Sequence, residues 1–386
     1  QAAAATAANL ANMIVLDDGK SLQNPNPVPY IGADNTLRAG DSVSNLVCVI
    51  DFGLVTSSNP GPTGYKLQPA VTPFFTRDNP RTTTPTLPVG NVKVASFNVL
   101  NFFTTFTDGT TVSAQSGQGC SLGSSTSKSN CRGADTLAEF QRQRAKIVAA
   151  ITAIDADALG LMEIQNNGDT AVANLVDALN AVAGGGAYAV VPKSATTGDD
   201  AIRVAMIYKP SKLTLVGPAL FDPDPVNNRP PMAQTFASRD GQIFSLVVNH
   251  LKSKGSCPAA GDPDADAGDG QGCWNATRIR QAQRLASVFI PRVQAAAGDA
   301  DVLVIGDMNA YGMEDPIAAL GNAGLVNQIE RFLRRGGVPY SSVFDGESGY
   351  LDHALATASL NSQVLGVHEW HINADEPSVI DYNTEF

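Results

Sequence analysis

The chain has 386 residues, of which 43% are hydrophobic, and its formal net charge is −11. The hydrophobic content excludes wholesale disorder, and the acidic balance excludes a protein that coats nucleic acid through a basic surface. The sequence contains no run of about 18 apolar residues, so we expect no membrane span.

The first 90 residues contain short apolar runs separated by segments rich in proline and glycine. This pattern predicts a small, OB-like β module over residues 1–78, incomplete as it stands. The proline-rich stretch 79–90 (NPRTTTPTLPVG) is expected to be an extended linker. A separate domain is expected over residues 91–386.

Within that domain, strand and helix patterns alternate, with some strands adjacent to each other. Helices are expected over 135–154, near 170–183 and from Asn275, which is a suitable N-cap residue. Apolar strands are expected at 158–164, 188–191, 201–208, 243–251 and in the segments DVLVIGDMN and GYLDHALA. The mixture favours a mixed-sheet α/β sandwich over a parallel barrel.

Two cysteine pairs would each close a polar, glycine-rich loop, Cys120 with Cys131 and Cys257 with Cys273. Disulfides of this kind indicate an oxidising compartment. The start of the chain shows no signal peptide, so either a leader was removed or the chain is a piece of a longer protein. The cysteines and the low charge content of 16% lead us to expect a secreted, extracellular or cell-surface protein whose leader is not in this sequence.

Apolar strands repeatedly end in acidic, amide or histidine residues, and the segments are SFNVLN, LMEIQN, VVNHLKSK, VIGDMN and YLDH. Each ending alone is explained as well by a turn, a surface ion pair or a core histidine. Five in one chain favour a crevice where strand ends converge. The oxygen-bearing residues Asn98, Glu163, Asp307 and Asn309 suit Mg²⁺, Mn²⁺ or Ca²⁺. A carboxylate-held metal beside histidine and lysine suits phosphate-ester hydrolysis.

The ordered segments SFNVLNFF, LMEIQN, AIRVAMIY, NHLKSKGSC, VIGDMNAYGMEDPI and YLDHALA resemble the endonuclease/exonuclease/phosphatase superfamily, the deoxyribonuclease I group. The resemblance is strongest to bacterial extracellular nucleases of the ExeM type. It implies a DNase I-like α/β fold over residues 91–386, in which two mixed sheets flanked by helices form a four-layer sandwich.

The resemblance also implies roles for individual residues. Glu163 would be the principal ligand of Mg²⁺ or Mn²⁺, with Asn98 beside it. Asp307 would orient or activate water, Asn309 would hold a phosphate oxygen, and His250 would donate to the phosphate. Asp352 would orient a second histidine.

In the superfamily that histidine lies in a Ser-Asp-His-Asp-Pro stretch, which this sequence does not contain. The sequence therefore predicts a truncated domain that lacks its last strand and cleaves plasmid DNA weakly or not at all. His353 is not expected to substitute, because strand alternation directs it away from Asp352.

Four further features carry weaker expectations. Arg203 could contact phosphate or be an ordinary strand residue, and Lys252 and Lys254 could contact phosphate from the end of a strand. The acidic loop with Asp262, Asp264 and Asp266 begins like a calcium loop but departs from the EF-hand pattern, so structural Ca²⁺ there is a hypothesis.

The sequence thus predicts a monomeric, secreted, metal-dependent nuclease that hydrolyses DNA, with RNA as an alternative substrate. A phosphatase or phospholipid phosphodiesterase of the same fold, and a non-catalytic extracellular binding module, remain the competing hypotheses.

Overall fold

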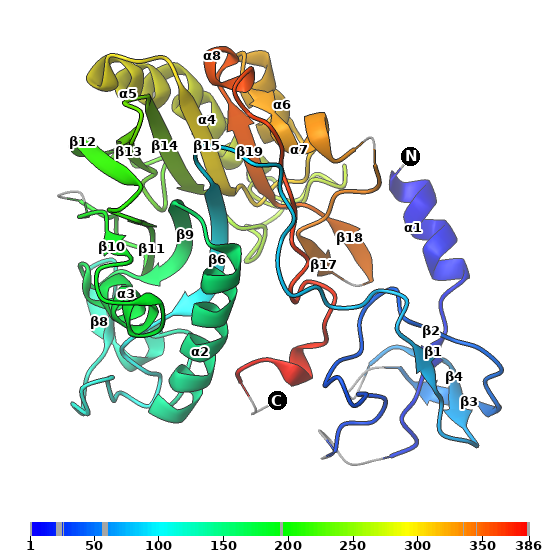
Figure 1. Ribbon diagram of the computed structural model, residues 1–386. Helices are drawn as coiled ribbons and strands as arrows, with labels where there is room; N and C mark the ends of the chain where they lie inside the picture. The colour runs from blue at the N-terminus through cyan, green and yellow to red at the C-terminus, as the bar shows by residue number, and fades with distance from the viewer. Residues whose placement is uncertain are drawn as a thin grey trace. The chain divides into compact units, whose positions relative to one another are not determined.

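The computed structural model describes residues 2–20, 25, 27–55, 61–193, 196–334, 336–344 and 346–383. Two compact units are present (Figure 1). Unit 1 comprises Gln1–Arg81 and Ile372–Phe386, and unit 2 comprises Thr82–His371. The first unit therefore contains a C-terminal segment that the sequence assigned to the second domain.

Arg38 accounts for the place of that segment. Its guanidinium lies 2.9 Å from Asp375 Oδ2 and 2.8 Å from Glu376 Oε1, and the side chains of Arg38 and Asp375 are almost fully buried. A buried arginine needs such partners, because an unpaired charge inside a protein is costly.

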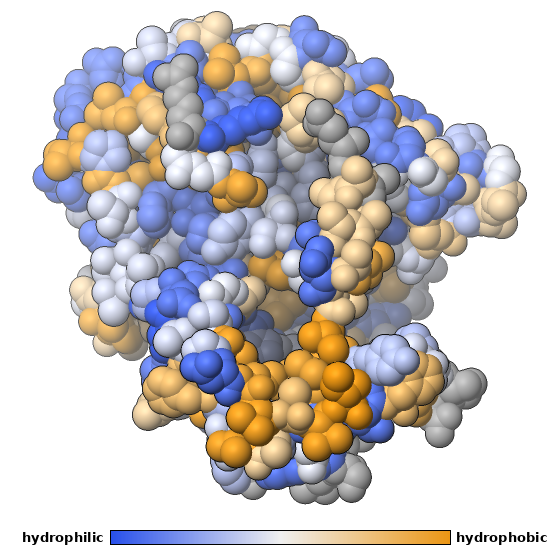
Figure 2. Space-filling model, turned by 90° about the vertical axis from the view of Figure 1, so that its right-hand side faces the viewer, coloured by the Kyte–Doolittle hydropathy of each residue, from blue (hydrophilic) through white to orange (hydrophobic). Residues whose placement is uncertain are grey.

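Unit 1 holds a three-stranded sheet in the order β1–β4–β3 and a separate pair, β2–β5. Its elements are α1 (Ala2–Ala11), β1 (Val15–Leu16), β2 (Ser42–Val43), β3 (Cys48–Leu54), β4 (Thr63–Pro69), β5 (Phe75–Thr76) and the 3-10 turn η3 (Ser378–Ile380). Apolar side chains gather on its surface (Figure 2), among them Val49, Ile50 and Phe52 of β3.

Unit 2 contains two mixed sheets. The four-stranded sheet has the order β10 (Ala189–Val190), β11 (Ile202–Tyr208), β9 (Ala158–Gln165) and β6 (Val94–Phe102). The six-stranded sheet has the order β12 (Leu213–Phe221), β13 (Met232–Ser238), β14 (Ile243–His250), β15 (Val302–Asp307), β19 (Asp352–Ala356) and β16 (Val326–Asn327). The pairs β6–β9 and β14–β15 are parallel and the others are antiparallel.

Helices cover the outer faces of both sheets (Figure 1). Contacts place α2 (Leu137–Ile154) and α3 (Thr170–Ala183) against the four-stranded sheet. Helices α4 (Asn275–Arg284) and α5 (Ile290–Ala297), joined by the π-helical turn η2 (Leu285–Phe289), and α6 (Asp315–Asn322) share an apolar core with the six-stranded sheet. The predicted α/β fold class is confirmed.

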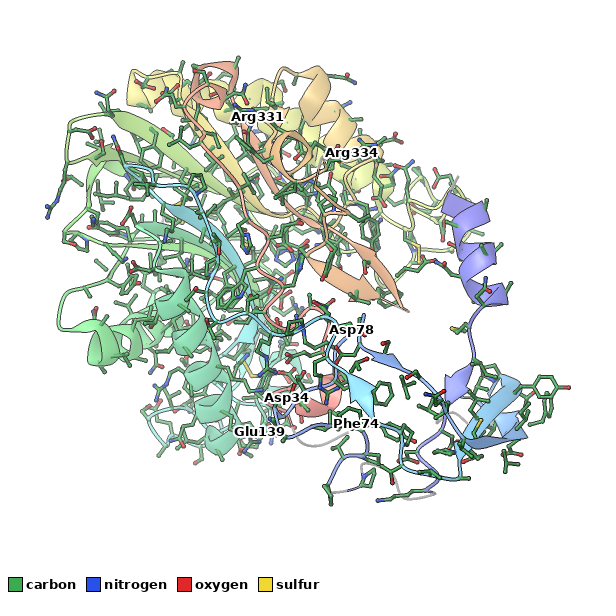
Figure 3. The ribbon with its side chains drawn as sticks, turned by 45° about the vertical axis from the view of Figure 1, so that its right-hand side comes forward. Asp34, Phe74, Asp78, Glu139, Arg331 and Arg334 are labelled. Atoms are coloured by element: carbon green, nitrogen blue, oxygen red, sulfur yellow. A yellow bond between two sulfur atoms is a disulfide. The ribbon has the colours of Figure 1, made fainter. Side chains whose placement is uncertain are left out.

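The remaining elements are short. They are the hairpins β7 (Cys120–Leu122)–β8 (Ser125–Ser127) and β17 (Ser342–Phe344)–β18 (Glu347–Gly349), the 3-10 turn η1 (Lys128–Asn130), and helices α7 (Gln328–Phe332) and α8 (Ala358–Asn361). Arg331 of α7, labelled in Figure 3, donates to the backbone oxygen of Asn361 and so joins α7 to α8. None of the helices among the described residues has the length and apolar character needed to cross a membrane.

The two sheets pack closely face to face. Met162 and Met206 from one sheet share a fully buried apolar cluster with Phe236 and Val248 from the other. Gly160 allows the approach, since a Cβ atom at this position would lie 2.5 Å from Val248 Cγ2. This contact brings the ends of strands from both sheets to one region.

Helix α4 begins differently from the prediction. Trp274, in the left-handed conformation, precedes the helix, and Asn275 is its first residue rather than its cap. The carboxylate of Asp264 instead accepts from the Thr277 backbone N–H at 2.7 Å and from Thr277 Oγ1 at 2.6 Å. A distant loop therefore supplies the cap.

Candidate active site

One amide group joins the strand ends of the two sheets. Asn98, on β6, donates from Nδ2 to Glu163 Oε1 at 3.0 Å and to Asp307 Oδ2 at 3.3 Å. Glu163 lies on β9 of the same sheet, and Asp307 ends β15 of the other. Three predicted site residues therefore meet in direct contact.

The backbone around Glu163 is strained. The register of β6 against β9 shifts between Asn98 and Phe102, and the bulged residues Leu100 and Asn101 have φ of 51° and 50°. Glu163 itself has φ of 64°. The Asn101 N–H donates to Glu163 Oε2 at 2.9 Å. Left-handed backbone at three non-glycine residues is costly and persists where the surroundings fix it, often at functional sites.

His250 lies beside Asp307, as the parallel pairing of β14 with β15 dictates. Its Nε2 is 3.7 Å from Asp307 Oδ2, and its Nδ1 is buried without a hydrogen-bond partner among the described residues. Burial, followed by the charges of Arg229 and Arg132, holds the pKa of His250 well below its ordinary value. The imidazole is therefore neutral at physiological pH.

Asn309 completes the loop after β15. Its backbone N–H donates to Asp307 Oδ1 at 2.8 Å, and its Nδ2 donates to Leu251 O at 3.1 Å. The residue has φ of 46°, a conformation that asparagine tolerates better than most residues. Its side chain therefore lies at the ends of both β14 and β15.

Asp352 faces Asp307 directly across the β15–β19 pair. Burial raises the pKa of the Asp307 carboxyl, and repulsion from Asp352 and Glu163 adds to this effect. The hydrogen-bond partner of Asp352 is Ser341. His353 is buried on the opposite face, with Nε2 2.8 Å from Ala310 O. Within the described ranges no histidine is hydrogen-bonded to Asp352, so the predicted orienting role stays a prediction.

The donor chemistry suits a hard cation. The carboxylates of Glu163, Asp307 and Asp352 lie close enough to repel one another, and a divalent ion would relieve this repulsion. The described residues contain no group of three or more His, Cys, Asp or Glu side chains arranged to hold a metal. Proteins can hold Mg²⁺ through a single carboxylate, with water and substrate phosphate supplying the remaining ligands. Glu163 would be that carboxylate, with Asn98 beside it.

Comparison with known proteins identifies the family. A family profile described as the Endonuclease/Exonuclease/phosphatase family matches residues 95–375. The chain belongs to this family. Its members are hydrolytic phosphoesterases, generally dependent on a divalent metal, and they include nucleases and phosphatases. No curated protein sequence matches the chain.

Solved structures of the family share the fold at low sequence identity. The human Nocturnin catalytic domain with bound sulfate is 19% identical, with 62% of this chain and 81% of that chain covered and a TM-score of 0.40. The mannosyl-6-phosphatase of Bacteroides thetaiotaomicron is 16% identical, with 69% and 86% covered and a TM-score of 0.43. D. rerio TDP2 with a single-strand DNA product is 16% identical, with 58% and 79% covered and a TM-score of 0.39.

Two of the residues predicted to contact phosphate, Arg203 and Lys254, form ion pairs with carboxylates of the protein. Arg203 is buried, and its guanidinium donates to Gly168 O and lies 2.9 Å from Asp169 Oδ1. Lys254 Nζ lies 2.6 Å from Glu314 Oε1 and also donates to Gln271 O. Each cation is thus paired with a nearby carboxylate in this structure, and the predicted phosphate contacts of Arg203 and Lys254 stay predictions.

Lys252 lies two residues after His250 and within the electrostatic influence of Arg229 and Asp200. Its Nζ lies 4.4 Å from the centre of the Trp274 ring, and its backbone N–H donates to Gln281 at 3.0 Å. Burial lowers the pKa of Lys252, and the Arg229 charge lowers it further. Lys252 therefore stays a candidate phosphate contact.

The calcium hypothesis gains no support. Asp264 is occupied as the cap of α4, while Asp262 Oδ1 and Asp266 Oδ1 accept the backbone N–H groups of Asp264 and Gly268. These bonds make local turns, and the described residues show no metal-binding group at the loop.

The two disulfides in the structure are Cys120–Cys131 and Cys257–Cys273. Sequence reasoning missed a buried cation at the site, Arg229, whose Nε donates to His250 O at 3.1 Å and whose Nη2 donates to Leu251 O. Nothing in its local sequence, NNRPP, signals this role, because the contact depends on packing across the sheet.

Proposed function

We propose that the protein is a secreted, divalent-metal-dependent phosphodiesterase that hydrolyses DNA, with RNA as an alternative polynucleotide substrate. The observation that carries the proposal is the Asn98 amide, which holds the Glu163 and Asp307 carboxylates together next to His250. Such a set provides one carboxylate for a cation and another for a water molecule.

Each residue then has a distinct chemical task. Asp307 accepts a proton from the water whose oxygen attacks phosphorus, and the phosphorus–oxygen bond to the leaving nucleotide breaks. Neutral His250 donates a hydrogen bond to a non-bridging phosphate oxygen, and the free amide N–H of Asn309 supports the same group. The metal, when bound at Glu163, supplies Lewis-acid neutralisation of phosphate charge.

Secretion is supported by the disulfides. Both close loops of unit 2, and disulfides persist in oxidising compartments. The acidic net charge is compatible with this function, because the substrate would be met by local groups rather than by the overall field.

The test is cleavage of plasmid DNA with enzyme in excess, so that a slow single turnover is still measured. With Mg²⁺ we expect strand breaks that EDTA abolishes, and we expect Glu163→Gln to lower the rate at least about 100-fold. Glu347→Gln, on the exposed hairpin strand β18, is the matched control and should cleave at the wild-type rate.

Two outcomes would overturn the proposal. Metal-dependent cleavage that persists unchanged in Glu163→Gln would place the site elsewhere. Release of phosphate from a sugar monophosphate, with DNA and RNA left intact, would make the protein a phosphatase of the same family.

A further inference from the structure

The segment between β6 and α2 has no place in the chemistry described so far. It holds the hairpin β7–β8 and the Cys120–Cys131 disulfide, and it returns to the site at Arg132. The Arg132 side chain is 38% exposed, and its Nη2 lies 3.3 Å from Asp200 Oδ1. This is the one ion pair of the Arg132 side chain among the described residues.

Asp200 connects Arg132 to the catalytic strand. Its other oxygen, Oδ2, lies 3.2 Å from Nη1 of Arg229, the buried arginine that donates to His250 O and Leu251 O. Arg132 is therefore the exposed end of a chain of charges that reaches the backbone of His250. The effect of its charge on the pKa of His250 agrees with this proximity.

Gly133, the residue after Arg132, lies against the turn that contacts Glu163. Gly133 has φ of +82°, and a Cβ atom there would lie 2.1 Å from Asn101 O. Asn101 is the residue whose N–H donates to Glu163 Oε2. The close approach is open to glycine alone, and it holds the backbone next to Arg132 against the turn that contacts Glu163.

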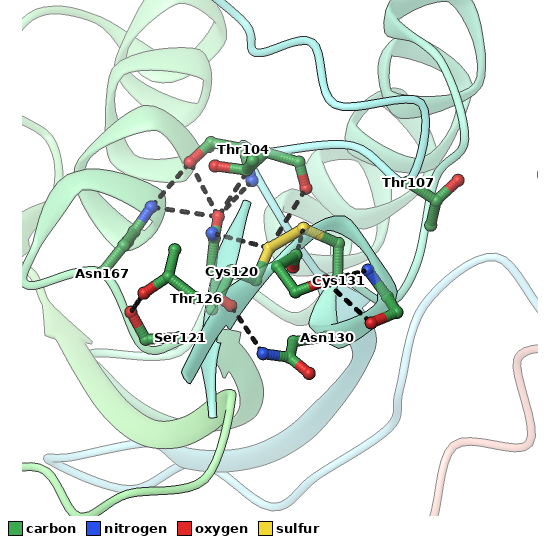
Figure 4. The surroundings of a disulfide bond; sticks show 12 residues. Thr104, Thr107, Cys120, Ser121, Thr126, Asn130, Cys131 and Asn167 are labelled. Atoms are coloured by element: carbon green, nitrogen blue, oxygen red, sulfur yellow. Dashed lines mark hydrogen bonds between the residues drawn. A yellow bond between two sulfur atoms is a disulfide. The ribbon is translucent and has the colours of Figure 1, made fainter. Parts of the chain in front are cut away.

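The Cys120–Cys131 disulfide, whose surroundings are shown in Figure 4, anchors the segment that carries Arg132. Cys131 immediately precedes Arg132, and its partner Cys120 is buried, with Sγ 3.4 Å from Gln165 Nε2. Gln165 lies two residues after Glu163 on β9, and its Oε1 accepts from the Thr104 N–H at 2.8 Å. The loop is thus tied to the strand that carries the metal-binding carboxylate.

The site holds an acidic cluster and a cationic cluster. Glu163, Asp307 and Asp352 form the acidic cluster. Arg132 and Arg229 of the cationic cluster pair with the Asp200 carboxylate, and Lys252 lies within its electrostatic influence. Arg229 is buried, so Arg132 is the arginine of this group that a ligand can reach. A guanidinium with donors to spare matches the oxygens of a phosphate group.

We propose that Arg132 is a substrate-binding residue that grips a phosphate of the polynucleotide, and that the Cys120–Cys131 disulfide positions it. The inference rests on the proposed phosphodiesterase function and extends it by naming how the substrate backbone is held. Asp200 orients the guanidinium before the substrate arrives.

Steady-state kinetics on DNA test the role of Arg132. Arg132→Gln should raise KM on the order of tenfold and leave kcat within about twofold, and Arg132→Lys should recover part of the loss. Arg142→Gln is the matched control, since Arg142 is a similarly exposed arginine that also forms an ion pair, with Glu139. A wild-type KM for Arg132→Gln, or an equal rise in the Arg142 variant, would overturn the inference.

Binding measured without cleavage separates this inference from the proposed function. In the Glu163→Gln background, Arg132→Gln should weaken binding of a DNA duplex and reduce the slope of log Kd against log salt by about 1. Unchanged binding and slope would refute the role of Arg132 even if the wild-type enzyme cleaves DNA. Failure of the wild-type enzyme to cleave DNA would instead refute the function.

The disulfide is tested by Cys120→Ser/Cys131→Ser, with the melting temperature recorded to confirm folding. We expect a rise in KM like that of Arg132→Gln, and little further rise when the two changes are combined. Fully additive effects on KM would show that the disulfide does not act through Arg132.

Discussion

At the residue scale, Asn98 has the most informative geometry. Its position at a strand end and the family resemblance suggested a metal ligand beside Glu163, and the structure shows its amide nitrogen between two carboxylates. A sequence pattern can identify the residue type and the strand end. It cannot show which amide atom faces which carboxylate, because that depends on the bulge at Leu100 and Asn101.

Replacing Asn98 should therefore affect chemistry more than stability. Asn98→Ala removes both bridging hydrogen bonds, each to a charged group, and lets the carboxylates separate. We expect a loss in kcat/KM of about 10- to 100-fold, with the melting temperature nearly unchanged. Asn91→Ala, an exposed asparagine near the start of β6, is the control. Equal activity of both variants in the plasmid assay would contradict the bridging role.

His353 should govern part of the acid stability. It is buried, and burial lowers its pKa from an ordinary 6.5 to about 4, against smaller opposing effects of the hydrogen bond with the Ala310 backbone and of the Glu330 charge. The groups around it are the Ala310 carbonyl, the Tyr350 ring at 4.8 Å and the Glu330 carboxylate. Because the unfolded chain binds the proton more readily, stability is fully present above the unfolded pKa and is lost as the pH falls through this window.

His353→Gln should flatten this dependence. Urea unfolding between pH 7 and pH 4 should show a steeper loss for the wild-type protein, by at most about 1.4 kcal/mol per pH unit. Parallel curves for the two proteins would show that His353 does not titrate in this window.

At the scale of secondary structure, local patterns predicted the long elements well. The helix expected over 135–154 is α2, whose first turn is capped by Thr136, and the strand expected at 158–164 is β9. The antiparallel strands β12 and β13 were missed. Their sequences carry glycine and proline or short polar alternation, and their pairing is set by contact with β14 rather than by local propensity.

The cap of α4 shows a second limit of local patterns. Asn275 has the right chemistry for an N-cap, yet Asp264 performs the task from a loop eleven residues away in the chain. The same aspartate lies in the acidic run that suggested calcium. Because capping consumes its carboxylate, the two interpretations make opposite predictions.

Asp264→Ala should destabilise the protein by about 1–2 kcal/mol, the usual cost of losing a cap. Asp262→Ala, which removes an exposed turn acceptor, should change stability by less than about 0.5 kcal/mol. Neither Ca²⁺ nor EDTA should shift the melting temperature of either variant or of the wild-type protein. A calcium-dependent shift lost in both variants would restore the calcium site.

At the scale of the whole molecule, the sequence predicted that five strand ends converge. The packing of the two sheets brings four residues from these ends together, and they are Asn98, Glu163, His250 and Asp307. Each strand end could be predicted from its own local sequence. Because β6 is parallel to β9 and β14 is parallel to β15, the carboxyl ends of the two strands in each pair lie side by side. The contacts within the cationic cluster could not be predicted in this way. Arg132 and Arg229 come from loops, and Asp200 joins them through contacts that no local pattern encodes.

The net charge of −11 limits how the proposed DNA substrate would be bound. With few cations near the site, and Arg229 buried, we expect two or three phosphate contacts at most. Kd of the Glu163→Gln variant for duplex DNA, at constant Mg²⁺, should then rise by only about 10- to 40-fold between 50 and 200 mM salt. A basic protein with six to ten phosphate contacts would lose about 10³- to 10⁵-fold over the same range. A loss of affinity near 10³-fold would mean that a much larger basic surface contacts the DNA. It would contradict the proposal that a few local groups such as Arg132 bind the phosphates. The salt series therefore tests whether a few local groups and a bound cation are enough to bind DNA despite the repulsion between the DNA and the negative net charge of the protein.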